Sequence, residues 1–273
     1  VKPTTKLKDN TYQCEVLRIL GHINDPGVDI LSIVCEHDFP DAFSEEAMKE
    51  VEQIPGSLSE TEISNRLNND GIDLRNHMIF TIDGDDTKDI DDAVEVQKLE
   101  NGNYYLGVHI ADVSYYVKPG MKVYEEAYTR GTSVYLADRV IPMLPHKLSN
   151  GICSLNPGED RFALSCMVEI DPSGKILSTD IKESVIRSRK QMTYKCVNSI
   201  LEKNEIPSGY EEFADTLKVM QELASILRKN KEARGYIDFD IDEAKIIVDE
   251  NGKAIDVVLR ERGTGEKLIE DFM

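Results

Sequence analysis

The chain has 273 residues, of which 40% are hydrophobic, and its 51 acidic and 32 basic side chains give a formal charge of −19. This length suits one large domain, or a domain with a small appendage, around a sizeable core. No apolar run reaches the roughly 18 residues that a membrane-spanning helix needs, and the first residues lack the features of a signal peptide. We therefore expect a cytoplasmic protein that has no contact with a membrane.

Residues 1–70 predict a small β module followed by two helices. Residues 12–20 and 29–36 are apolar runs rich in β-branched side chains, and a turn signal lies between them, which is typical of paired strands. Helical patterns follow at 44–53 and 59–69, and a capping box of the S-x-x-E type opens the second one.

From residue 78 the pattern alternates between strand hairpins and separate helices. Strands are expected at 78–82, 93–99, 104–113, 161–171 and 176–189, with a last hairpin at 244–261. Helices are expected at 121–130, 193–203 and 211–231. This order predicts an α+β fold in which helices pack against a mixed or antiparallel sheet.

The charge of −19 argues against nucleic-acid binding, because a nucleic-acid binder usually exposes a basic face to the phosphate backbone. Two features offset this argument. Part of the acidity lies in exposed helical patterns between residues 40 and 70. The chain also has no initiator methionine, and its last helical pattern stops without a cap at Met273, so we expect a piece of a longer protein.

Six carboxylates lie within residues 83–92, where an apolar run turns into a loop, while the cysteines and histidines are scattered without the spacing of a zinc site. Carboxylates at this density repel one another unless cations neutralise them, and hard divalent cations prefer oxygen ligands. Mg²⁺, with Mn²⁺ as a possible substitute, suits a phosphodiester-cleaving site because it completes its coordination with phosphate oxygens. A calcium loop of the EF-hand type fits less well, since Lys88 and Val94 stand where glycine and glutamate are required. The alternative is a solvated acidic loop.

The pattern TID-x5-DxDD resembles the catalytic centre of the ribonuclease II/ribonuclease R (RNB-domain) family, and its details are closest to the ribonuclease R type. The segments 109–117, 133–170 and 268–273 resemble the same domain in the same order. The resemblance implies an incomplete RNB-type catalytic domain. Its expected parts are the end of the second cold-shock (OB-fold) β-barrel at 1–37, a helical linker at 38–70, and the N-terminal part of the RNB domain at 71–273.

The resemblance also implies the roles of particular residues. The magnesium-binding and catalytic carboxylates would be Asp83, Asp89, Asp91 and Asp92. The residues that contact RNA would be Tyr135, Phe239, Glu270 and Asp271. Tyr135 and Phe239 would stack on bases near the 3′ end without sequence preference, and either Glu270 or Asp271 would contact the terminal ribose. Loss of Asp91 is expected to abolish cleavage most cleanly.

The implied function is a hydrolytic 3′→5′ exoribonuclease that degrades single-stranded RNA from its 3′ end to nucleoside 5′-monophosphates by Mg²⁺-dependent hydrolysis. A second half of the catalytic domain, which holds a phosphate-assisting arginine, and an S1 domain are expected outside this chain. We therefore expect the chain alone to bind RNA weakly and to cleave little or nothing. One alternative is a non-catalytic, acidic, metal-stabilised protein-interaction domain. The other is a phosphatase or DNA nuclease that uses a similar acidic cluster.

Overall fold

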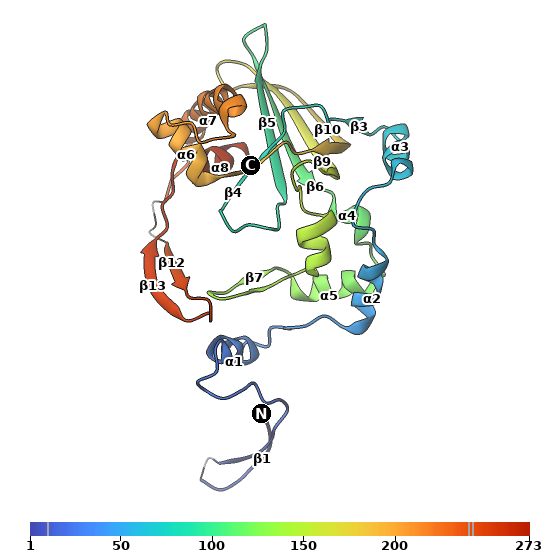
Figure 1. Ribbon diagram of the computed structural model, residues 1–273, viewed down its shortest axis with the longest axis vertical. Coiled ribbons are helices and arrows are strands. Elements are labelled where there is room, and N and C mark those ends of the chain that lie inside the picture. Colours follow the sequence, from blue (N-terminus) through green and yellow to red (C-terminus); the bar gives the residue numbers. More distant parts are fainter. Residues whose placement is uncertain (10, 240, 242) are drawn as a thin grey trace.

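A computed structural model describes residues 1–9, 11–239, 241 and 243–273. A five-stranded sheet with the order β3-β10-β9-β6-β5 lies at its centre (Figure 1). The strands are β3 (Ile72–Asp73), β5 (Asp92–Lys98), β6 (Tyr104–Ala111), β9 (Asp160–Ile170) and β10 (Ile176–Arg187). Four of them form antiparallel pairs and β3 joins β10 in parallel, so the predicted mixed sheet of an α+β fold is confirmed.

Both predicted hairpins of this sheet are present, and each turns at a glycine. Gly102 closes the β5–β6 turn with φ 85°, and Gly174 closes the β9–β10 turn with φ 83°. A side chain at such a left-handed position would be strained, and glycine removes that strain. At Gly174 an added Cβ would also lie 2.4 Å from the amide of Asn230, so the turn packs against a helix.

Three helices cover one face of the sheet near the C-terminus of the chain (Figure 1). They are α6 (Tyr194–Lys203), α7 (Ala214–Ala233), which follows the short 3₁₀ turn η2 (Glu211–Phe213), and α8 (Thr264–Phe272). Their apolar side chains and those of the inner strands form the largest core, which includes Phe80, Tyr104, Phe213, Leu217 and Met220. Full burial of each such side chain contributes about 1.5–3 kcal/mol. This core fixes the helices on the sheet.

A second core joins the helical segments after the N-terminal module to the ends of β9 and β10. The segments are α2 (Glu45–Gln53), α3 (Glu60–Asn68), α4 (Val113–Tyr116), α5 (Lys122–Arg130) and the π-helical turn η1 (Leu148–Ile152). The predicted capping box at the start of α3 is present, because Ser59 and Glu62 each accept a hydrogen bond from the other's backbone N–H. Within this core Ala47, Val51 and Ile63 are buried.

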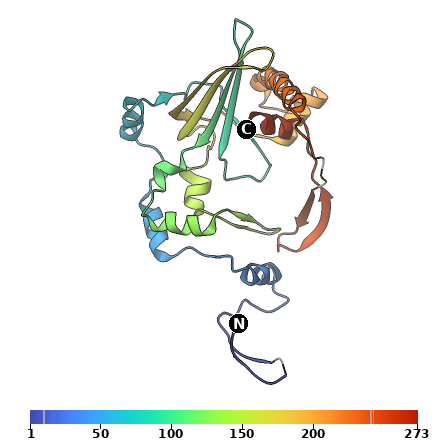
Figure 2. The ribbon, with the colours of Figure 1, turned by 180° about the vertical axis from the view of Figure 1, so that it is seen from behind.

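The N-terminal module lies at one end of the molecule (Figures 1 and 2), and Arg139 donates to the Gly27 carbonyl at 3.3 Å, just before its helix. It consists of β1 (Lys2–Lys6), β2 (Tyr12–Glu15) and α1 (Val28–Glu36). The strand expected at 29–36 is wrong, because β2 pairs with β1 instead and leaves this segment without a partner strand. The segment forms a helix that begins after Gly27, with Asp29 in the first turn near the positive end of the helix dipole. Among the described residues, no helix has the length and apolar character needed to cross a membrane.

Three small strand pairs surround the loop of residues 84–91, which we call the acidic loop (Figure 1). They are β4 (Thr81–Asp83) with β11 (Gln191–Thr193), β7 (Val134–Tyr135) with β8 (Val140–Ile141), and β12 (Ala244–Val248) with β13 (Ala254–Leu259). The last of these is the hairpin predicted at 244–261.

Candidate functional site

The acidic loop leaves the sheet at one carboxylate and returns at another. Asp83 is the last residue of β4, and Asp92 is the first residue of β5. The two strands lie side by side because Phe80 and Val94 exchange backbone hydrogen bonds of 3.2 and 2.9 Å. The chain folds this way since both side chains are fully buried in the main core. Asp83 and Asp92 are therefore held at the two ends of the loop.

Buried polar contacts hold the middle of the acidic loop. The Ser154 hydroxyl donates to the Lys88 carbonyl at 2.8 Å and accepts from the Ile90 backbone N–H at 3.1 Å. Ser154 is itself fixed by Arg161, whose Nε donates to its carbonyl at 2.8 Å. From β11, the Gln191 side chain donates to the Thr87 carbonyl at 2.9 Å. The loop thus has a fixed path, unlike a loop that is free in solvent.

The charges of the four predicted aspartates act on one another. Desolvation, reinforced by the charges of Asp92, Asp91 and Asp89, raises the pKa of Asp83 to about 6. Desolvation also raises the pKa of Asp91, again with help from the charges of Asp89 and Asp92. Burial raises the pKa of Asp92 as well. These carboxylates therefore repel one another and disfavour their own charged forms.

A divalent cation would relieve this repulsion. Asp83 Oδ2 is buried and accepts no hydrogen bond of ordinary geometry, although the Thr81 hydroxyl is near enough to lower the pKa of the same carboxylate. In the part of the chain that the structure describes, no three histidine, cysteine or acidic side chains form a group that could hold a metal ion. Mg²⁺ can be bound through one or two carboxylates, with waters filling its other positions, so single carboxylates such as Asp83 are suitable ligands for it.

Tyr135, predicted to contact RNA, lies at the acidic loop. Its side chain is 65% exposed, and its hydroxyl donates to Asp89 Oδ2 at 2.6 Å. This hydrogen bond is the main reason that the pKa of Tyr135 rises to about 12. Tyr135 lines a cleft of about 1010 Å³ between the acidic loop, the β7–β8 hairpin and the β12–β13 hairpin. We call this the loop cleft.

Phe239 lies in a second cleft of about 710 Å³, which we call the Phe239 cleft. Its ring is 72% exposed, so it is not part of a packed core. Glu270 lines the same cleft, whereas Tyr135 does not. Tyr135 and Phe239 are therefore in different clefts, and Arg260 lines both of them.

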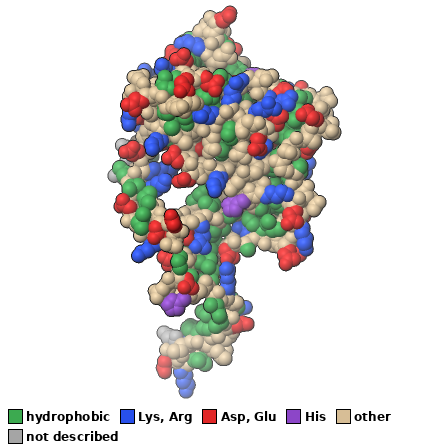
Figure 3. Space-filling view, viewed as in Figure 1, with side chains coloured by type: hydrophobic (Ala, Val, Ile, Leu, Met, Phe, Trp, Pro, Cys, Tyr) green, Lys and Arg blue, Asp and Glu red, His purple; other side chains and the backbone are tan. Residues whose placement is uncertain are grey.

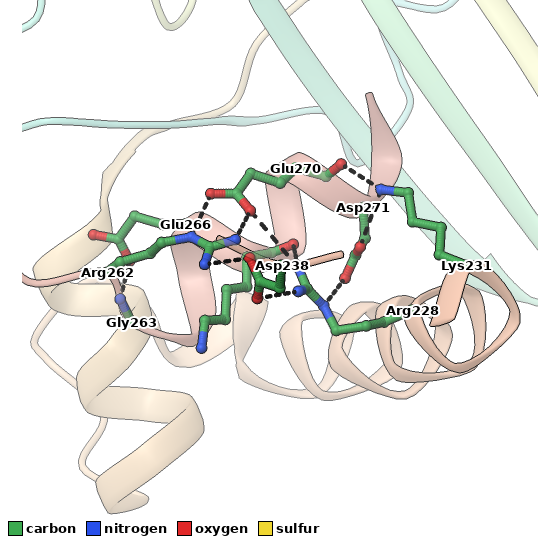
Figure 4. A network of polar contacts seen from close by, with 9 residues as sticks. Arg228, Lys231, Asp238, Arg262, Gly263, Glu266, Glu270 and Asp271 are labelled. Atoms are coloured by element: carbon green, nitrogen blue, oxygen red, sulfur yellow. Dashed lines mark hydrogen bonds and ion pairs between the residues drawn. The ribbon is translucent and has the colours of Figure 1, made fainter. Parts of the chain in front are cut away.

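Glu270 and Asp271 take part in one network of ion pairs but occupy different positions (Figure 4). Asp271 is buried and accepts from Arg228 Nε at 2.8 Å and from Lys231 Nζ at 3.3 Å. Glu270 accepts from Arg262 Nε at 2.8 Å and faces the Phe239 cleft. Of the two residues, Glu270 is thus the one placed to meet a ligand in that cleft.

The same network holds the segment that carries Phe239. Asp238, the preceding residue, accepts from Arg262 at 2.9 Å and from Arg228 at 3.2 Å (Figure 4). Phe239 itself is exposed, but the residue beside it is fixed to α7 and to the segment before α8. The ring is therefore presented from a supported backbone.

Sequence reasoning missed Tyr194, the first residue of α6. It lines the Phe239 cleft. Burial raises its pKa to about 12, and the charges of Asp83 and Asp92 contribute to this shift. The residue before Tyr194, Thr193, pairs with Asp83 in the β4–β11 register, so Tyr194 follows directly after the strand that lies beside the carboxylate site. Its position depends on how α6 packs, which no local motif indicates.

The raised pKa of Asp83 predicts how stability depends on pH without metal. The value of about 6, against an ordinary 3.8, means that native-state ionisation costs up to roughly 2–3 kcal/mol, less where water reaches the carboxylate. The stability that the native state gains from a protonated Asp83 is fully present below about pH 4 and is lost as the pH rises through 6. We expect Asp83→Asn to unfold at higher urea concentration than the unchanged chain at pH 7, and at a similar concentration at pH 4. Urea unfolding in a chelating buffer checks this. Asp85→Asn, at an exposed position, is the control. An equal gain in stability at pH 7 from this variant would show that the effect is not specific to Asp83.

Comparisons with known proteins agree on the family to which the chain is similar. A family model described as "RNB domain" matches residues 72–273, and one described as "Cold shock domain" matches residues 1–44. Ribonuclease R of Thermotoga maritima is 49% identical over 264 residues, which are 96% of this chain and 36% of that protein. The chain spans about a third of the length of the curated relatives it matches.

Solved structures give the same result. Mycoplasma genitalium RNase R, in complex with ribose-methylated single-stranded RNA, matches with a TM-score of 0.87 and 28% identity, over 96% of this chain and 39% of that one. Its complex with double-stranded RNA matches with a TM-score of 0.90 over 97% and 46%. Yeast Ssd1, described as a pseudonuclease, has a TM-score of 0.66 and 20% identity over 92% and 30%, which is a likeness of fold alone.

Proposed function

The chain belongs to the RNB-domain family, and from that premise we propose that it supplies the acidic half of the active site of a hydrolytic 3′→5′ exoribonuclease of the ribonuclease R type. The observation that carries the proposal is the fixed path of the acidic loop, which brings the charges of Asp89, Asp91 and Asp92 to bear on the buried carboxylate of Asp83. A solvated acidic loop would have neither this burial nor its fixed path.

In this proposal, Asp83, Asp89, Asp91 and Asp92 hold Mg²⁺, with Mn²⁺ as a substitute. When bound, the cation supplies charge that activates water and stabilises the phosphate during hydrolysis. The chain's own contribution is the fixed loop. Ser154 and Gln191 hold its backbone, and the hydroxyl of Tyr135 orients Asp89. Cleavage of the last phosphodiester would release one nucleoside 5′-monophosphate at a time.

The RNA-contacting residues of the proposal are distributed over the two clefts. Tyr135 and Phe239 present exposed rings on which bases of a single strand can stack, irrespective of sequence. Glu270 would contact the terminal ribose from the Phe239 cleft. We do not assign that contact to Asp271, because its side chain is 3% exposed, whereas that of Glu270, although paired with Arg262, is 42% exposed.

The domain organisation is part of the proposal. Residues 1–37 would end a cold-shock barrel, 38–70 would link it to the next domain, and 71–273 would begin the RNB domain. The family matches at 1–44 and 72–273 support a division into these two domains, although the cold-shock match continues to residue 44, past the proposed boundary at 37. Because the relatives are about three times as long, the remaining part of the catalytic domain and an S1 domain would complete the RNA channel. The chain alone should then cleave weakly.

A non-catalytic, metal-stabilised interaction domain is the second candidate function. One observation keeps it beside the proposed activity. The chain shares its fold with a protein described as a pseudonuclease. Hydrolysis of RNA separates the two candidates.

The test uses a hybrid protein in which this chain replaces the matching segment of the T. maritima ribonuclease R. The hybrid, the parent protein and the isolated chain are incubated with Mg²⁺ and 5′-labelled single-stranded RNA or DNA. We expect the hybrid to shorten RNA stepwise from the 3′ end and to spare DNA, with little activity from the isolated chain. A hybrid that binds RNA and leaves it intact with Mg²⁺ and with Mn²⁺ would favour the non-catalytic function.

A further inference from the structure

A phosphate backbone that approaches this site meets a strongly acidic surface. Lys and Arg side chains are interspersed with acidic ones on the face shown in Figure 3, and they do not gather into one basic patch. Three basic residues that line the clefts lie outside the acidic loop: Lys245, Arg260 and Arg262. Whether each of them can bind a phosphate depends on the ion pairs that it already forms with carboxylates of the protein.

Arg262 is committed to the protein, whereas Arg260 is not. Arg262 binds Glu270 and Asp238 in the network described above, and its side chain is 28% exposed. Arg260 forms an ion pair with Glu243 at 3.2 Å, and both side chains are more than 60% exposed. An exposed pair of this kind contributes little to stability. Arg260 can therefore exchange Glu243 for a phosphate at small cost.

The β12–β13 hairpin directs Arg260 and Lys245 to the same side. The Arg260 backbone N–H donates to the Glu243 carbonyl at 2.8 Å, and Lys245 lies opposite Val258 in the strand register. Residues that are opposite, or two apart along a strand, share one face of a hairpin. Lys245 and Arg260 both line the loop cleft, so this face is turned toward the acidic loop.

Arg260 also lies at the junction of the two clefts. It lines the loop cleft with Tyr135 and the Phe239 cleft with Phe239. Its charge lowers the pKa of Tyr194, which burial and the charges of Asp83 and Asp92 raise. A strand that extends through both clefts, from one proposed stacking ring to the other, would therefore meet Arg260.

We propose that Arg260, with Lys245 beside it, contacts backbone phosphates of a single strand that passes between the Phe239 cleft and the acidic loop. The inference rests on the proposed function and adds a phosphate-guiding role for the β12–β13 hairpin. Contacts of this kind position a strand and do not select its sequence. The positive charges of Arg260 and Lys245 offset the repulsion between the phosphates of the strand and the aspartates at the point where the strand reaches the acidic loop.

The test measures how salt affects RNA binding by the whole chain. Fluorescence anisotropy with a 3′-accessible oligouridine probe is recorded in chelating buffer, from low salt upward. For single strands, each lost phosphate contact should reduce the slope of log Kobs against log salt by about 0.7. We expect this reduction in Arg260→Gln and about twice it in Arg260→Gln/Lys245→Gln, with equal weakening on an oligoadenosine probe. Arg260→Lys should retain most of the slope.

Arg187→Gln is the matched control. Arg187 is also an exposed arginine in an ion pair, with Asp160 at 2.7 Å, but it lines neither cleft. Its slope should equal that of the unchanged chain. If the slope stays unaltered in Arg260→Gln and in Arg260→Gln/Lys245→Gln, or falls equally in Arg187→Gln, the inference is overturned while the proposed function stands. If the unchanged chain binds no RNA even at low salt, the inference is overturned, and hydrolysis by the hybrid protein still decides the proposed function.

Discussion

Asp91→Asn is expected to reduce RNA hydrolysis by the hybrid protein by at least about 10²-fold, the scale at which loss of one charge-stabilising group lowers an enzymatic rate. Asparagine keeps the size of the side chain but removes a charge that we place at the cation. The fold should survive, because the contact of Asp91 with the sheet is its backbone carbonyl, which accepts from the Ala111 N–H at 2.9 Å. Removal of a charge that repels Asp89 and Asp92 should even stabilise the metal-free chain slightly.

Single-turnover rates at saturating enzyme measure this effect without a contribution from binding. Asp85→Asn is the matched control, since Asp85 is an exposed aspartate of the same loop but lies outside the family pattern. We expect its rate to remain within a few-fold of the unchanged hybrid. Equal losses in both variants would mean that the loop acts through its total charge, and would remove the special role of Asp91.

Arg66→Met should lower the free energy of unfolding by about 3–5 kcal/mol, the usual result of breaking one partner out of a buried ion pair. Arg66 lies on α3 and binds Asp112 Oδ2 at 2.6 Å, with both side chains less than 5% exposed. Its guanidinium also lies over the Phe162 ring, 4.1 Å from the centroid. Methionine preserves much of the volume but leaves the Asp112 carboxylate, which caps α4, without a counter-charge.

Urea unfolding at pH 7 tests this prediction. Arg18→Met is the control, because the Arg18–Asp41 pair has side chains 54% and 33% exposed and should contribute less than about 1 kcal/mol. The double variant Arg66→Met/Asp112→Asn should recover part of the loss, since it removes the unpaired charge. A change below about 1 kcal/mol for Arg66→Met would show that α3 is not anchored to the sheet through this pair.

Elements with local signals could be predicted from the sequence. The capping box at Ser59 marks the start of α3, and the turns at Gly102 and Gly174 mark hairpins, because each depends on a few neighbouring residues. The segment 29–36 was mistaken for a strand because its apolar run suits both periodicities, and the choice depended on whether β2 had another partner. The choice between strand and helix thus depended on pairing between segments that are distant in the sequence.

The candidate site shows the same division. The aspartate pattern and Tyr135 are visible in the sequence because the family motif is local, and the structure adds that Tyr135 bonds to Asp89. Ser154 and Arg260 carry no comparable signal. Ser154 reaches the acidic loop from a distant turn, and Arg260 lies in both clefts only after the β12–β13 hairpin is placed. Such contacts arise from tertiary packing, so the sequence alone does not reveal them.

Calorimetric titration of Mn²⁺ into the chain, with and without a non-hydrolysable single-stranded RNA, tests the metal-and-phosphate site most directly. If the aspartates form one site with a backbone phosphate, the cation binds more tightly when RNA is present, and RNA binds more tightly by the same factor when the cation is present. Asp91→Asn should eliminate this coupling. A Mn²⁺ affinity that RNA leaves unchanged, or coupling that persists in Asp91→Asn, would contradict the account.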